Sequence, residues 1–218
     1  TEKNYRRNYE ILRQLTFVFF CISSVVAAGL FSLITPFICD IWLSPAYELG
    51  WGTAVLCIVV LLIKIMGLPL SLMMGVTGLF EKEKNAGASS AVLNLVVSLA
   101  LVRPYGMTGV LLGTLLSYLL QICYRYVIFF RDFLEMKEEA IRYARDLGEY
   151  TAVMILEVAV TRRIIPLIYG NGGMTPFIFC FVLCILVPLA LNGVFLGRGW
   201  RLQSIVKMVR GMKRSGSR

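Results

Sequence analysis

Residues 15–39 read LTFVFFCISSVVAAGLFSLITPFIC and contain no charged side chain. This run exceeds the roughly 18 apolar residues that indicate a transmembrane helix. Similar runs follow, and over the whole chain 58% of residues are hydrophobic and only 16% are charged, against about 25% charged residues in soluble domains. This composition excludes a soluble globular protein and intrinsic disorder. A transmembrane barrel would show alternating segments of about 10 residues. We therefore predict an all-α, polytopic transmembrane helical bundle.

The apolar runs predict about six spans, separated by polar segments. Hydropathy places the spans at 15–39, 53–79, 86–102, 107–130, 150–169 and 175–196. We expect the chain to divide into a cytoplasmic head, a four-span unit, an amphipathic helix on the cytoplasmic interface, two further spans and a basic cytoplasmic tail. The expected bounds of these five parts are 1–14, 15–130, 131–149, 150–196 and 197–218.

Basic residues are distributed unevenly between the two sides of this arrangement. The chain has a net charge of +9, and seventeen of its 22 Lys and Arg residues fall on the side of the termini, against three on the other side. Cytoplasmic loops are rich in Lys and Arg, so we expect both termini in the cytoplasm and contact with anionic lipids at that face. No basic face is interleaved with exposed aromatic residues, so we expect no nucleic-acid partner.

Residues that commonly carry enzymatic or metal chemistry are scarce. The chain has no His, and its six Cys lie in apolar runs without a CxxC pair. His is the commonest acid–base group and metal ligand. Motifs of acyl transfer, ester hydrolysis, phosphate loops and glycosyl transfer are also absent. We therefore expect no catalysis, no metal and no cofactor.

Small and polar residues repeat every four positions in the third and fourth predicted spans. Gly109, Gly113 and Ser117 form one such stripe, and Asn94 belongs to the stripe of the preceding span. Small residues on one face let membrane helices approach closely, and Ser or Asn hydrogen-bonds across them. We therefore expect a tightly packed helical hairpin; the alternative is that Asn94 faces a polar cavity.

Charged side chains within the spans are the sharpest functional signal. Lys64 lies near the middle of the second span, and Glu157, Arg162 and Arg163 interrupt the fifth. A charge at the bilayer centre costs about 2.5–3.5 kcal/mol or more, so it usually faces a cavity or a partner. Lys64 and Glu157 either line a cavity or pair with each other. The two arginines either line a cavity or extend to the outer interface.

Two stretches resemble a known family. Residues 36–38 (PFI) and 41–47 (IWLSPAY) resemble a "P…LWLG..Y" pattern, and residues 91–99 (AVLNLVVSL) and 105–114 (YGMTGVLLGT) resemble an "iNlvlsl.L…G..Gv.lgT" hairpin. Both patterns are typical of bacterial O-antigen and capsule flippases (Wzx type) of the multidrug/oligosaccharidyl-lipid/polysaccharide exporter superfamily. The resemblance covers roughly residues 10–135. Ser44 stands where the family usually has Gly.

This resemblance implies the C-terminal lobe of a two-lobed transporter in the bacterial inner membrane. Its cargo would be undecaprenyl-pyrophosphate-linked oligosaccharide, and its partner would be the missing N-terminal lobe of the same protein. Such cavities are cationic, so Lys64, Arg162 and Arg163, with Asn94, are the candidate cavity residues, and Glu157 is a candidate charge partner or ion-coupling residue. The alternatives are a polymerase or acyltransferase of polysaccharide assembly, or an exporter of drugs or of peptidoglycan precursor.

Overall fold

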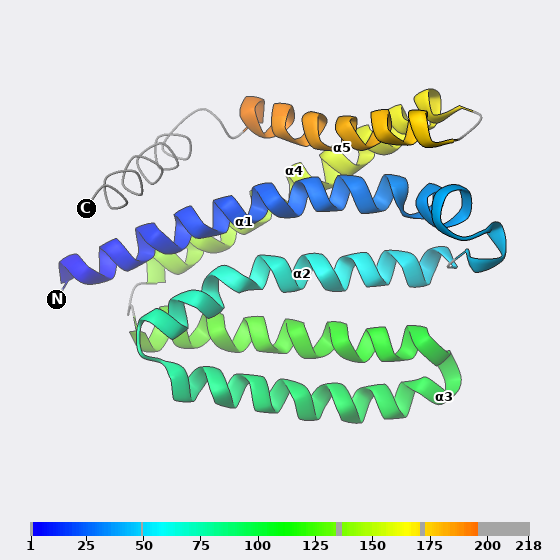
Figure 1. Cartoon of the computed structure of the whole chain (residues 1–218). Helices are drawn as coiled ribbons and strands as arrows, with labels where there is room; N and C mark the ends of the chain where they lie inside the picture. Colours follow the sequence, from blue (N-terminus) through cyan, green and yellow to red (C-terminus); the bar gives the residue numbers. More distant parts are fainter. Residues whose placement is uncertain (1, 49, 134–136, 171–172, 196–218) are drawn as a thin grey trace, which may run out of the picture.

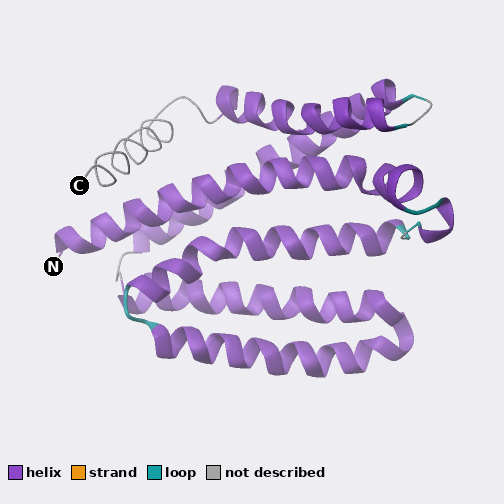
Figure 2. Ribbon diagram, viewed as in Figure 1, coloured by secondary structure: helices purple, strands orange, loops and turns teal. Residues whose placement is uncertain are grey.

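The computed structural model describes residues 2–48, 50–133, 137–170 and 173–195. In these residues the protein is all-α, with five α-helices and no strand (Figure 2). The helices are α1 (Glu2–Pro36), α2 (Trp51–Val76), α3 (Phe80–Val127), α4 (Lys137–Tyr169) and α5 (Met174–Phe195). The basic tail predicted for residues 197–218 lies outside the described residues.

Four of the described helical segments are long and apolar enough to cross a membrane, which suggests a membrane protein. They are Tyr5–Trp42, Trp51–Val76, Phe80–Arg131 and Met174–Phe195. The fifth predicted span, 150–169, lies within α4 and is not among these four, because its charged residues lower the hydropathy of the stretch. The third and fourth predicted spans lie together in α3.

A sharp bend at Gly106 divides α3 into two antiparallel halves (Figure 1). Gly106 has φ 55° and ψ −133°, whereas the residues around it are helical. A side chain is disfavoured at this positive φ, so glycine suits the position. This bend lies between the third and fourth predicted spans, and the second half of α3 runs back beside the first, as expected for a helical hairpin.

The helices lie roughly alongside one another and alternate in direction (Figure 1). The start of α1, the turn between α2 and α3 and the start of α4 lie at one end of the bundle. These are the segments in which the sequence places most of its predicted cytoplasmic Lys and Arg. Helix α1 is central, because it packs against α2, α4 and α5.

Two predicted segment boundaries fall inside continuous helices. Helix α1 starts at Glu2 and runs without a break through the predicted end of the head at residue 14. Helix α4 joins the predicted amphipathic helix to the fifth predicted span. The amphipathic part folds against α1: Arg13 Nε donates to Asp146 Oδ2 over 2.7 Å, and the Thr16 and Tyr143 hydroxyls lie 3.1 Å apart. These contacts give the helix ordered partners at one end of the bundle.

Candidate functional site

Lys64 lies on α2 at a polar groove between α2 and the second half of α3. Its side chain is exposed, and its Nζ lies 5.9 Å from the centroid of the Tyr118 ring. The groove has a volume of about 100 Å³. Besides Lys64, the lining residues are Gly67, Leu68, Ser71, Tyr118, Gln121, Ile122 and Arg125.

Helical spacing explains why these side chains meet. Ser71 follows Lys64 by seven residues on α2, and Arg125 follows Tyr118 by seven on α3, so each pair lies on one helix face two turns apart. Gln121 lies between Tyr118 and Arg125 on that face. This second row was not among the predicted site residues, although its i, i+3, i+7 spacing is a signal that could have indicated it.

Glu83, on the first half of α3, bonds two of the residues that line the groove. Arg125 Nε donates to Glu83 Oε2 over 2.9 Å, and a second bond joins Arg125 Nη2 to Glu83 Oε1. Ser71 Oγ donates to Glu83 Oε1 over 2.9 Å. Glu83 therefore compensates the charge of Arg125, whereas Lys64 forms no ion pair within the described residues. The groove is left with one uncompensated positive charge.

The size and charge of the groove limit what it can bind. A water molecule occupies roughly 30 Å³, so a volume of about 100 Å³ holds only a small group. Lys64 offers three N–H donors, and Gln121 and Tyr118 offer further hydrogen-bonding atoms. The groove therefore fits a small anionic group and is too small for a sugar chain.

Glu157 lies at a different interface, between α4, α1 and α5. It is 0% exposed, and the side chain of Ser24 on α1 lies close to its carboxyl group. Lys64 and Glu157 form no ion pair, since Lys64 faces α3 from the other side of α2. Of the two predicted arrangements, lining of a cavity or pairing with each other, the pairing of Lys64 with Glu157 is therefore absent from the structure.

Arg162 and Arg163 are both exposed and lie in the C-terminal third of α4. The Arg162 guanidinium lies 4.2 Å from the centroid of the Trp51 ring, at the start of α2. Such a cation–π contact contributes about 0.5–1 kcal/mol at an exposed site. This geometry resembles an interface anchor more than a cavity lining, and neither arginine is among the residues that line the Lys64 groove.

Asn94 belongs to the packed hairpin of α3. Its Oδ1 accepts hydrogen bonds from Ser98 Oγ at 2.9 Å and from Thr114 Oγ1 at 3.4 Å. Gly109, Gly113 and Ser117 are buried on the facing half of α3. The Asn94 oxygen is therefore engaged in joining the two halves.

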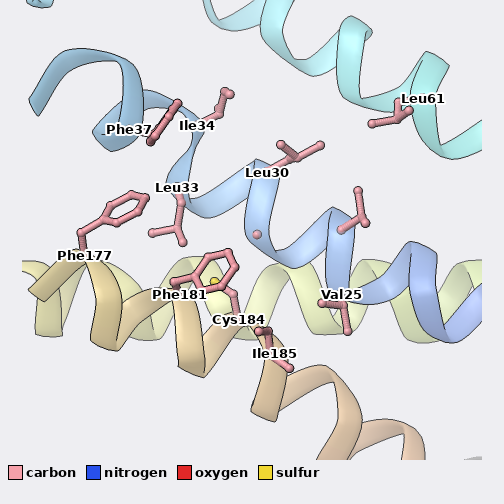
Figure 3. A pocket seen from close by; sticks show the side chains of 12 residues that line it. Val25, Leu30, Leu33, Ile34, Phe37, Leu61, Phe177, Phe181, Cys184 and Ile185 are labelled. Atoms are coloured by element: carbon pink, nitrogen blue, oxygen red, sulfur yellow. The ribbon is translucent and has the colours of Figure 1, made fainter. Parts of the chain in front are cut away.

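Two larger hollows are apolar and lie away from these charges. One of about 560 Å³ is bordered by α1, α2 and α5, and Figure 3 shows Phe37, Phe177 and Phe181 around it. A second, of about 580 Å³, is bordered by α1, α2, α3 and α4. Their linings contain no charged side chain, so they offer nothing that would bind a phosphate.

Comparison with known proteins finds no matching family model, no matching curated protein and no matching solved structure.

Proposed function

We propose that this chain is one lobe of a membrane transporter that moves undecaprenyl-pyrophosphate-linked oligosaccharide across the bacterial inner membrane for surface polysaccharide synthesis. The observation that supports this most directly is Lys64. It places an uncompensated ammonium group in a polar groove within a helix that is otherwise apolar enough to span the bilayer. Such an intramembrane charge usually marks a substrate or ion pathway.

The chemistry of this cargo matches the groove. The diphosphate group of this lipid is anionic and small, and a Lys ammonium with nearby amide and hydroxyl groups is a suitable ligand for it. In this proposal the phosphate head contacts Lys64 and Gln121, while the sugars stay outside the groove. The walls that enclose the sugars belong to the second lobe, and transport proceeds by rocking of one lobe against the other.

The resemblance of residues 91–99 and 105–114 to the flippase hairpin supports the same family. In the structure these two stretches lie on opposite halves of α3 and pack against each other. The same lobe would also suit an exporter of drugs or of peptidoglycan precursor. The lipid-linked species that accumulates when the gene is deleted separates these cargoes.

The experiment replaces Lys64 in the full protein and measures surface polysaccharide together with the amount of protein in the membrane. We expect Lys64→Ala to abolish export at a normal protein level, and Lys64→Arg to retain part of it, because the charge is kept. Lys84→Ala is the matched control, since Lys84 is an exposed lysine outside the groove. Full export by Lys64→Ala would refute the proposal.

A further inference from the structure

A second group of polar side chains lies inside the bundle where α1, α4 and α5 meet. Glu157 and Ser24 are 0% exposed, and Asn192 of α5 is 5% exposed. Asn192 Nδ2 donates to Ser24 Oγ over 2.9 Å, which joins α5 to α1 beside the carboxyl group. Among the residues that the structure describes, neither carboxyl oxygen of Glu157 has a hydrogen-bond partner, and the Asn192 Oδ1 also has none.

The described helices around Glu157 offer no charge to balance a carboxylate. Residues 14–36 of α1 and 174–195 of α5 contain no charged residue. The arginines that follow on α4 are exposed, and Lys64 faces α3. A buried charge without a partner is strongly unfavourable, so a carboxyl group in such a place binds a cation or a proton instead.

The hydrogen bonds of Ser24 favour a proton. A serine hydroxyl has one hydrogen to donate and two lone pairs to accept with. Ser24 Oγ donates to the Cys21 carbonyl over 3.1 Å and accepts from Asn192. Ser24 Oγ therefore has one lone pair left that can accept a hydrogen bond. A carboxylate has no hydrogen to donate to it, whereas a protonated carboxyl group donates its O–H.

We propose that Glu157 is a proton-binding site within the membrane, which holds its proton as a carboxylic acid facing Ser24. When the α1–α4–α5 contact opens to water, the proton leaves to a water molecule and the carboxylate remains. Ser24 then turns its hydroxyl from the Cys21 carbonyl to Glu157. The proton thus controls a contact that joins three helices. This inference is independent of the cargo proposed above.

The titratable groups around Glu157 do not provide a positive charge. Cys21 of α1 is close enough for its charge to interact with that of Glu157. Cys184 of α5 donates to the Ala28 carbonyl over 3.7 Å. Tyr150, two turns earlier on α4, stacks on Phe20 at 4.6 Å between ring centroids. The Cys and Tyr side chains are neutral when protonated and negative when they lose the proton. They therefore never stabilise a carboxylate at Glu157 and favour its protonated form.

The test uses infrared difference spectra of the purified full chain in lipid nanodiscs between pH 6 and pH 9. An ordinary Glu ionises at about pH 4.3, so exposed carboxyl groups give no acid band in this range. We expect the unmodified protein to show a carboxylic-acid C=O band at pH 7, and Glu157→Gln to lack it. Glu81→Gln, which changes an exposed carboxyl group, should leave the band unchanged.

A second variant reports on the proposed contact of the protonated carboxyl group with Ser24. Ser24→Ala removes the hydroxyl oxygen that would accept from Glu157, so the band should move to higher wavenumber, which a purely structural role of Ser24 would not cause. The proposal is overturned if the unmodified protein has no acid band at pH 7, or if Glu157→Gln retains it. An unmoved band in Ser24→Ala also overturns it, even where Glu157→Gln fails to fold. Loss of the band on adding NaCl at constant pH would assign the site to a metal cation instead.

Discussion

Replacing Gly109 by alanine tests how closely the two halves of α3 must approach. A Cβ at this position would lie 2.6 Å from the carbonyl carbon of Leu101 and closer still to its oxygen. Carbon atoms in contact prefer roughly 3.5–4.0 Å, so the two halves must move apart by about 1 Å. The obstacle is backbone, which cannot rotate away as a side chain would.

The cost of this movement has two parts. Overpacking a well-packed contact costs about 1–3 kcal/mol. The Ser98 Oγ–Val110 O hydrogen bond, 3.3 Å long, would stretch beyond bonding distance, which costs about 0.6 kcal/mol within a membrane. Alanine recovers at most about 1 kcal/mol of helix propensity. We therefore expect a net destabilisation of about 2 kcal/mol.

The assay is the midpoint temperature at which detergent-purified protein loses its monodisperse gel-filtration peak. For a chain of this size about 1 kcal/mol corresponds to roughly 2–4 °C, so Gly109→Ala should lower the midpoint by about 4–8 °C. Gly29→Ala is the matched control, because nothing lies within 4 Å of a Cβ there. Equal midpoints for the two variants would show that the halves of α3 do not need this close approach.

Three further changes test other contacts. Arg13→Ala should destabilise the protein by about 3 kcal/mol, because it leaves buried Asp146 without this ion-pair partner, and adding Asp146→Asn should recover much of that loss in the same thermal assay. Tyr143→Phe should cost about 1 kcal/mol through its lost hydroxyl contact and leave export unchanged. In a cysteine-free background, an impermeant thiol reagent added to intact cells should label a cysteine at Arg103 and spare one at Lys84, and the reverse pattern would invert the proposed orientation.

Hydropathy and periodicity predict much of this fold because they reflect local physics. The apolar runs predict helices, and four helices of the described chain are apolar enough to span a membrane. The Gly-containing turn after residue 102 also lies where the chain reverses. These features depend on neighbouring residues only, so one sequence suffices to find them.

The remaining features depend on residues far apart in the chain. Arg125 meets Glu83 across 42 positions, and Arg13 meets Asp146 across 133. Their spacing gives no signal, because nothing local distinguishes Glu83 from any other acidic residue at a helix start. The continuity of α4 through residue 150 has a different cause. No helix-breaking proline separates the amphipathic part from the apolar part, so the helix continues where a boundary was expected.

The positions of Lys64 and Glu157 explain why one protein keeps two opposite charges in its apolar helices without pairing them. The ammonium group lies in an open groove, where water or an anion can compensate its charge. The carboxyl group is fully buried and depends on a proton for neutrality.

If the two side chains were paired, binding of an anion at Lys64 would leave a buried carboxylate without its partner. Because α2 separates them, anion binding and proton binding alter different helix contacts. Helix α2 packs against both α1 and α3, so it is the element through which the two sites would be coupled. Coupling between cargo and proton would then depend on the position of α2, and it needs no direct contact between the two side chains.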